Sequence, residues 1–139
     1  MILKGFNFPK DIKIFISVPL RIIYWKSRLN KTGYNQIINR INTTGTKKSA
    51  GKDLLEKLEK THRAAGFFLN KIFKDPNPCI IRSLIIYGVC RKNNIKAALL
   101  TGVDKKNDKL EGHSWVEIDG KPVNESKKNL KRYKVVYKK

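Results

Sequence analysis

Cysteine is scarce in this sequence, and its two cysteines, Cys79 and Cys90, do not form a CxxC pair. A disulfide-stabilised fold would need more cysteines, and a zinc site would need a fuller set of ligands. A glycine-rich phosphate loop is missing as well. The sequence therefore predicts reduced thiols and no metal, nucleotide or other cofactor.

Acidic residues are also few. The chain has 11 Asp and Glu against 31 Lys and Arg, which gives a formal net charge of +20. Such a balance favours a polyanionic partner, which is a nucleic acid, an anionic membrane or an acidic protein surface. A non-enzymatic nucleic-acid-binding module is thus one hypothesis, and it predicts binding that weakens steeply with salt. Apolar residues make up 40% of the chain, which is enough for a core and excludes wholesale disorder.

A long uninterrupted apolar run is absent. The most apolar stretch, Ile12 to Trp25, contains Lys13, Pro19 and Arg21. A membrane span needs about 20 apolar residues, so this stretch predicts a core or interfacial helix. It also lacks the small-residue cleavage site of a signal peptide. We expect a cytoplasmic protein, and peripheral attachment to the inner face of the membrane remains an open alternative.

The length of 139 residues predicts one domain, with a helical part over about 1–93 and a sheet over about 94–139. Apolar spacing predicts helices within 1–42, with a break near Asn30 to Gly33, and over Lys52–Phe73. Thr43 to Gly51 reads as a polar turn region. The stretch from Cys79 to Lys92 is apolar on nearly every side, which is typical of a buried helix.

Strand patterns follow the helices. We expect strands over 95–103, 112–118, 121–125 and 131–137, a charged loop over 104–109 and a hairpin turn at Asp119-Gly120. Helices followed by an antiparallel sheet make an α+β fold.

Cys79 directly follows Pro78, so it falls in the first turn of the buried helix. The free N–H groups and the positive end of a helix N-terminus favour a thiolate, and they are able to stabilise an oxyanion. Cys90 lies about 16 Å further along the helix axis, too far to assist Cys79. We interpret Cys90 as a small buried hydrophobic residue.

His113 occurs on a predicted strand in GHSWVEIDG, whereas His62 lies in a predicted helix without a partner motif and is interpreted as structural. A cysteine at a helix N-terminus followed by a histidine on an antiparallel strand is the arrangement of papain-like and transglutaminase-like enzymes. The pair Cys79 and His113 therefore predicts a nucleophile and its general base. Trp115, nearby on the strand, is expected to pack in the core under or beside this site.

A third residue must orient the imidazole of His113. Glu117 and Asp119 are about 13 and 20 Å away along the strand, so the returning strand must supply it. A two-residue turn would place Asn124 on the face of His113 and turn Glu125 away. A three-residue turn would instead bring Glu125 to that face. The turn geometry leaves both alternatives open.

The stretch CIIRSLIIYGVCRKNNIKAALLTGV, followed by GHSWVEIDGKPVNE, resembles the B-type maturation proteins of lasso-peptide biosynthesis. These proteins are transglutaminase-like leader peptidases. The matching residues, in chain order, are Cys79, Arg82-Ser83-Leu84, Gly102-Val103, His113, Trp115-Val116-Glu117 and Asp119-Gly120. Ser114 replaces the usual alanine. The match covers roughly residues 78 to 125.

The resemblance implies that Cys79 is the nucleophile and His113 the base of a cysteine peptidase. The family has an aspartate twelve positions after the histidine, where this sequence has Glu125. We favour Glu125 over Asn124 as the third catalytic residue, because the aligned position and a bulged turn would agree.

The resemblance also implies a split form of the peptidase. Its partners would be a precursor peptide, a separate winged-helix-like leader-binding protein and a lasso cyclase. We therefore predict removal of a leader from a ribosomally made precursor. Acyl transfer to an amine by the same triad is an alternative. The basic segment 126–139 is interpreted as a solvated strand edge, and a docking patch is the alternative.

Overall fold

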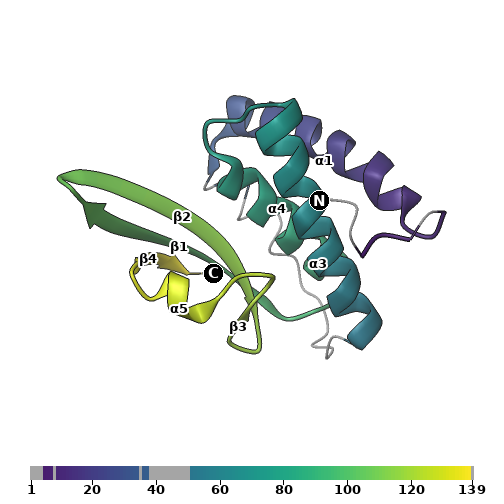
Figure 1. Cartoon of the computed structure of the whole chain (residues 1–139). Helices are drawn as coiled ribbons and strands as arrows, with labels where there is room; N and C mark the ends of the chain where they lie inside the picture. The colour runs from purple at the N-terminus through teal and green to yellow at the C-terminus, as the bar shows by residue number, and fades with distance from the viewer. Residues whose placement is uncertain (1–4, 8, 35, 38–50, 139) are drawn as a thin grey trace.

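The structure is a computed structural model that describes residues 5–7, 9–34, 36–37 and 51–138. It consists of a helical layer packed against one side of an antiparallel sheet (Figure 1). The helical layer contains α1 (Ile12–Thr32), α3 (Lys52–Phe67), the π-helical turn η1 (Phe68–Ile72) and α4 (Pro78–Lys92). The rest of the fold contains β1 (Ala97–Lys106), β2 (Lys109–Ile118), β3 (Lys121–Pro122), α5 (Lys127–Leu130) and β4 (Lys134–Lys138). The predicted α+β arrangement is confirmed.

The apolar stretch near the N-terminus forms a single helix, α1. Its buried residues Ile14, Val18 and Ile22 recur at a spacing of four and face the other helices. Pro19 lies inside α1 without ending it. The helix ends at Gly33, whose positive φ of 77° suits glycine, and this break agrees with the predicted one. Within the described ranges, no helix offers an apolar stretch sufficient to span a lipid bilayer.

The predicted helix over Lys52–Phe73 is confirmed, although its last turn is wider than expected. The backbone N–H of Phe73 donates to the carbonyl of Phe68 at 2.8 Å, a five-residue step that defines the π-turn η1. The preceding predicted turn region, Thr43 to Gly51, lies outside the described residues except for Gly51.

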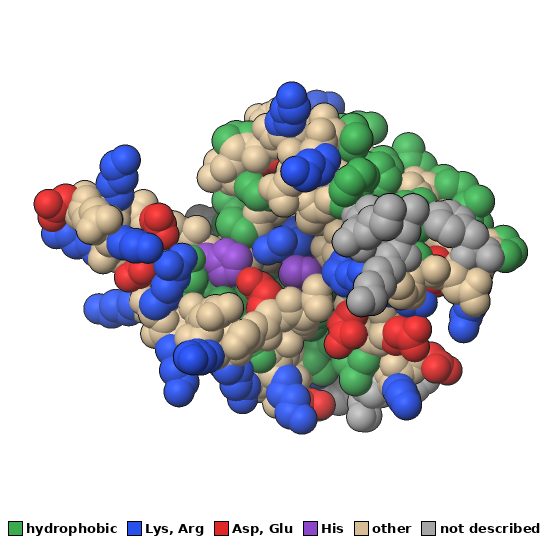
Figure 2. Space-filling model, in the orientation of Figure 1, with side chains coloured by type: hydrophobic (Ala, Val, Ile, Leu, Met, Phe, Trp, Pro, Cys, Tyr) green, Lys and Arg blue, Asp and Glu red, His purple; other side chains and the backbone are tan. Residues whose placement is uncertain are grey.

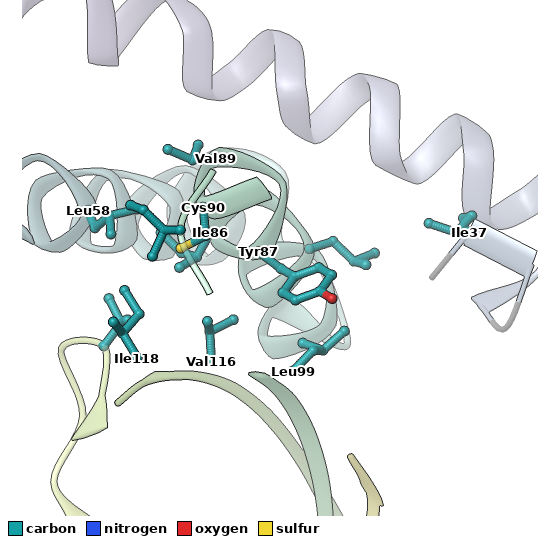
Figure 3. Packing of buried hydrophobic residues seen from close by; sticks show 12 residues of the cluster. Ile37, Leu58, Ile86, Tyr87, Val89, Cys90, Leu99, Val116 and Ile118 are labelled. Carbon is teal, nitrogen blue, oxygen red and sulfur yellow. The ribbon is translucent and has the colours of Figure 1, made fainter. Parts of the chain in front are cut away.

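Helix α4 is the centre of the core, as its all-round apolar sequence predicts. It packs between α1 and α3 on one side and the sheet on the other. Leu84, Ile86, Tyr87 and Cys90 are at most 1% exposed. Figure 3 shows residues of α4 meeting Leu58 from α3 and Leu99, Val116 and Ile118 from the sheet. This packing fixes the position of α4 relative to β2.

The sheet has the order β3-β2-β1-β4. Strands β1 and β2 pair from Ala97–Ile118 to Lys106–Lys109, and their hairpin projects beyond the helical layer (Figure 1). The expected charged loop over 104–109 is therefore wrong. Only Asn107 and Asp108 form the turn, both with positive φ, because charged side chains on an exposed hairpin stay solvated while the backbone pairs.

The turn at Asp119-Gly120 has two residues, since Ile118 pairs with Lys121. The three-residue bulged turn, one of the two alternatives that the sequence left open, is therefore wrong. Strand β3 ends at Pro122, and Asn124 adopts a left-handed conformation with φ of 52°. This backbone reversal, which a regular strand over 121–125 would not contain, changes the side on which Glu125 points.

The C-terminal segment differs from the predicted strand over 131–137. Its first part forms the short helix α5, and β4 begins only at Lys134. The Lys side chains at 127, 128, 131, 134 and 138 are exposed. Strand β4 pairs with β1 along the edge of the sheet.

Candidate active site

Cys79 is the second residue of α4, directly after Pro78. Its side chain is half-buried, and the backbone N–H of Ser114 donates a hydrogen bond to the sulfur. Burial alone would raise the pKa of the thiol. The hydrogen bonds with His113 and Ser114, together with the positive charges of His113 and Arg82, outweigh burial and lower the pKa of Cys79. The site therefore favours a thiolate.

His113 lies on β2, where it faces the N-terminal end of α4. Its imidazole stacks on Trp115 with ring centroids 5.9 Å apart, and on Tyr133 with centroids 5.2 Å apart. Trp115 is only 3% exposed, so it packs in the core beside the site. These two aromatic rings hold the plane of the imidazole.

Glu125 reaches the same imidazole from the segment that follows β3. Nε2 of His113 donates to Oε1 of Glu125 at 2.6 Å, and both side chains are 17% exposed. Asn124 does not contact His113 through any described hydrogen bond. Its amide donates to Nδ1 of His62 at 3.2 Å. The structure thus brings Glu125 to His113 and turns Asn124 towards His62.

The thiol and the imidazole influence each other's ionisation. The hydrogen bond with Cys79 and the hydrogen bond with Glu125 raise the pKa of His113 to about 9, against the opposing effect of burial. The imidazole is then positively charged and the thiol tends to lose its proton. Because Nε2 is engaged by Glu125, Nδ1 is the ring nitrogen left to exchange a proton with the sulfur.

A row of hydroxyl groups supports the backbone beside Cys79. The hydroxyls of Tyr34 and Thr101 are 3.3 Å apart, and those of Thr101 and Ser114 are 3.0 Å apart. Ser114 is 2% exposed. Since the backbone N–H of Ser114 contacts the sulfur, this row helps to fix a hydrogen-bond donor at the nucleophile. Tyr34 and Thr101 had no recognisable motif, so sequence reasoning missed them.

The second cysteine, Cys90, and the second histidine, His62, lie in surroundings that differ from those of Cys79 and His113. Cys90 is fully buried, and burial raises the pKa of its thiol to about 12, which makes it a poor nucleophile. His62 lies on α3 and is 9% exposed, with Nε2 at 3.9 Å from Oε2 of Glu125. Figure 2 shows both imidazoles of the chain on one hollowed face, with acidic and basic side chains between them.

In the described ranges, no group of three or more His, Cys, Asp and Glu side chains is placed to hold a metal ion. What the site does offer is a thiol at a helix N-terminus, an imidazole on a neighbouring strand and a carboxylate behind it. That set of groups suits thiol-based acyl chemistry.

A family model described as the transglutaminase-like superfamily matches residues 22–138. The chain belongs to the transglutaminase-like superfamily. The match spans α4, the sheet and all of the site residues described in this subsection. Members of this superfamily are usually cysteine proteases or acyltransferases, so the family assigns thiol-enzyme chemistry of this general kind. No curated protein and no solved structure gives a significant match to the chain.

Proposed function

We propose that the protein is a cysteine peptidase that removes the leader from a ribosomally made lasso-peptide precursor. The observation that carries the chemistry is the contact chain from the Cys79 thiol to His113 and on to Glu125. The sequence pattern from Cys79 to Asp119-Gly120, which resembles the lasso leader peptidases, supports the substrate class.

In the first half of the reaction, the Cys79 thiolate attacks the carbonyl carbon at the leader–core junction. The electron pair of the C=O bond moves to oxygen, and the backbone N–H of Cys79 in the first turn of α4 would donate to that charge. His113 then gives its proton to the amide nitrogen. The C–N bond breaks, the core leaves with a free amine, and the leader stays on sulfur as a thioester.

In the second half, water replaces the core. His113, now neutral, accepts a proton from the water as the water oxygen attacks the thioester carbon. The C–S bond breaks, the leader leaves as a carboxylic acid and the thiolate is restored. Glu125 stabilises the imidazolium each time it forms and keeps Nε2 protonated.

A cavity between α1 and the N-terminal end of α4 offers room for part of the substrate, although Cys79 is not one of its lining residues. It has a volume of about 330 Å³, and its walls include Leu29, Tyr34, Asn77 and Ile80. Asn77 and Ile80 flank Pro78-Cys79 in the chain. Lys26 and Asp75, which form an ion pair, line the same cavity, so its walls are partly apolar and partly charged.

The remaining partners are proposed on the resemblance and on charge. A separate leader-binding protein would deliver the precursor, and a cyclase would take the freed core. The exposed lysines of α5 and β4 would dock one of these proteins or an anionic membrane surface. Charge reversal of Lys127, Lys128 and Lys131 should weaken a pull-down with the leader-binding protein at low salt, and an unchanged pull-down would show that the segment is only solvated.

The central experiment is cleavage of a precursor peptide in the presence of its leader-binding protein, followed by mass spectrometry. The wild-type chain should release a core with a new N-terminus, while Cys79→Ala and His113→Ala should both be inactive. An added primary amine tests the alternative. A leader–amine conjugate would indicate acyl transfer, which the superfamily also includes.

A further inference from the structure

Glu125 presents two carboxylate oxygens to two different histidines. Oε1 accepts the hydrogen bond from His113 at 2.6 Å, and Oε2 lies 3.9 Å from Nε2 of His62. His62 comes from α3, while His113 comes from β2. The carboxylate is therefore placed between an imidazole of the helical layer and an imidazole of the sheet.

The orientation of His62 is set by the neighbour of Glu125 in the chain. The amide of Asn124 donates to Nδ1 of His62 at 3.2 Å. A neutral imidazole that accepts at Nδ1 carries its proton on Nε2. That N–H then points towards Oε2 of Glu125, and a small rotation would close the 3.9 Å separation to a hydrogen bond.

We propose that His62 is a positioning residue whose imidazole, oriented by Asn124, braces the outer oxygen of Glu125 so that the inner oxygen stays on His113. The inference rests on the proposed function, because it gives His113 the role of the base. His62 thus acts in the site although no catalytic motif surrounds it in the sequence.

The surroundings of His62 keep it neutral. Burial, followed by the positive charges of Arg82 and His113, lowers its pKa to about 3. A neutral donor supports the carboxylate without competing with His113 for its negative charge. A lysine or arginine in the same place would form its own ion pair with Glu125 and weaken the hold on the imidazolium.

A glutamate in this position needs such support. Its side chain has three rotatable bonds, and ordering it costs rotamer entropy that a shorter side chain would not lose. A second contact on the outer oxygen limits the orientations of the carboxylate. A precisely held third residue matters because it fixes the imidazole ring relative to the sulfur.

The test measures the reactivity of Cys79 and needs no peptide substrate. The pH dependence of iodoacetamide alkylation is followed by mass spectrometry of the peptide that contains Cys79. In His62→Leu, Glu125 loses its brace, and the alkylation midpoint should move upward by about one pH unit, which slows alkylation by up to about tenfold at pH values below the wild-type midpoint. His62→Gln, whose amide is able to donate to Glu125, should stay within about twofold of the wild type.

Two controls separate positioning from a general loss of structure. Thr61→Val removes a buried hydroxyl from the same helix, one that bonds only the carbonyl of Lys57 at 2.7 Å among the described contacts, and should leave the alkylation profile unchanged. In a Glu125→Gln background, His62→Leu should add little, because the charge that it braces is gone. Thermal melts report whether each variant folds.

The proposal is overturned if His62→Leu folds and keeps the wild-type alkylation profile. It is also overturned if the effect of His62→Leu is the same with and without the Glu125 carboxylate, or if His62→Gln is as impaired as His62→Leu. Failure of the leader-peptidase hypothesis would appear separately, as a wild-type chain that leaves the precursor uncut while its Cys79 alkylation profile responds to His62.

Discussion

Gly102 of β1 lies directly opposite His113 of β2 in the antiparallel ladder. A Cβ atom at Gly102 would come within 2.7 Å of Cβ of Tyr133 and 3.1 Å of the Trp115 ring. These two residues are the aromatic side chains on which the imidazole stacks. The glycine therefore leaves the space that these rings occupy beside His113.

Replacement of this glycine should disturb the site through packing alone. Gly102→Ala should displace Tyr133 or Trp115, destabilise the fold by roughly 1–3 kcal/mol and lower peptide cleavage. Gly112→Ala is the matched control on the neighbouring strand, because no atom of the described residues lies within 4 Å of its Cβ position. Urea denaturation and a cleavage assay compare the two variants, and equal behaviour would show that the close approach at Gly102 is tolerated.

The two thiols should differ strongly in reactivity. Cys79 is half-buried with a lowered pKa, whereas the pKa of buried Cys90 is raised to about 12. In the native protein at pH 7, iodoacetamide should modify Cys79 at least about 100-fold faster than Cys90. Peptide mapping by mass spectrometry gives both rates. Similar rates in the folded protein would contradict the proposed thiolate.

Glu125 and Asn124 should contribute unequally to catalysis. Glu125→Gln keeps the size of the side chain but removes the charge that stabilises the imidazolium, so the cleavage rate should fall by about 10²-fold or more. Asn124→Gly tolerates the positive φ of 52° and removes the one side-chain hydrogen bond of Asn124 found among the described residues, that to His62, so its loss of activity should be below about tenfold. A larger loss in Asn124→Gly than in Glu125→Gln would reverse the assignment.

The protonation of His113 should stabilise the fold on the acidic side of its pKa. Its folded-state pKa of about 9 exceeds the ordinary value of 6.5. The stabilisation is therefore complete below pH 6.5 and is lost as the pH rises through 9. The difference in the free energy of unfolding between wild type and His113→Gln should shrink over this window. A difference that grows with pH would mean that the imidazole is neutral in the native state.

His62 should act in the opposite sense. Its folded-state pKa of about 3 lies below the ordinary 6.5, so the unfolded chain binds an additional proton between these values. Stability is then lost as the pH falls from 6.5 towards 3. His62→Gln removes this contribution, so its free energy of unfolding should decline less than that of the wild type between pH 6.5 and 4. If the free energies of unfolding of the two proteins decline equally, His62 is exposed to solvent in the native protein.

The sequence predicted the helical layer well because apolar spacing is a local signal. The spacing of Leu54, Leu58, Ala65 and Leu69 indicated the helix formed by α3 and η1, and the all-round apolar character of α4 indicated its burial. The length of the hairpin of β1 and β2 was underestimated because its outer half is charged and therefore resembles a loop in the sequence. Helix α5 was missed because the segment Lys127–Leu130 is short and polar.

The arrangement of the site depends on backbone geometry and long-range contacts that a local sequence pattern does not show. One of the two reasons for choosing Glu125, the bulged turn, is contradicted, because the turn at Asp119-Gly120 has two residues. The left-handed backbone of Asn124 alters the side-chain direction, and a strand pattern gives no sign of it. His62 was set aside since its contacts with Asn124 and Glu125 are more than 60 positions away in the chain.

The proposed reaction centre lies at the interface between the helical layer and the sheet. The sulfur stands on α4, whereas the imidazole and the carboxylate stand on β2 and the segment beyond β3. Warming that lets these two layers slip by an ångström or two would part the sulfur from the imidazole while every helix and strand kept its own hydrogen bonds. Enzymatic competence should consequently fade at temperatures where circular dichroism still records an intact fold.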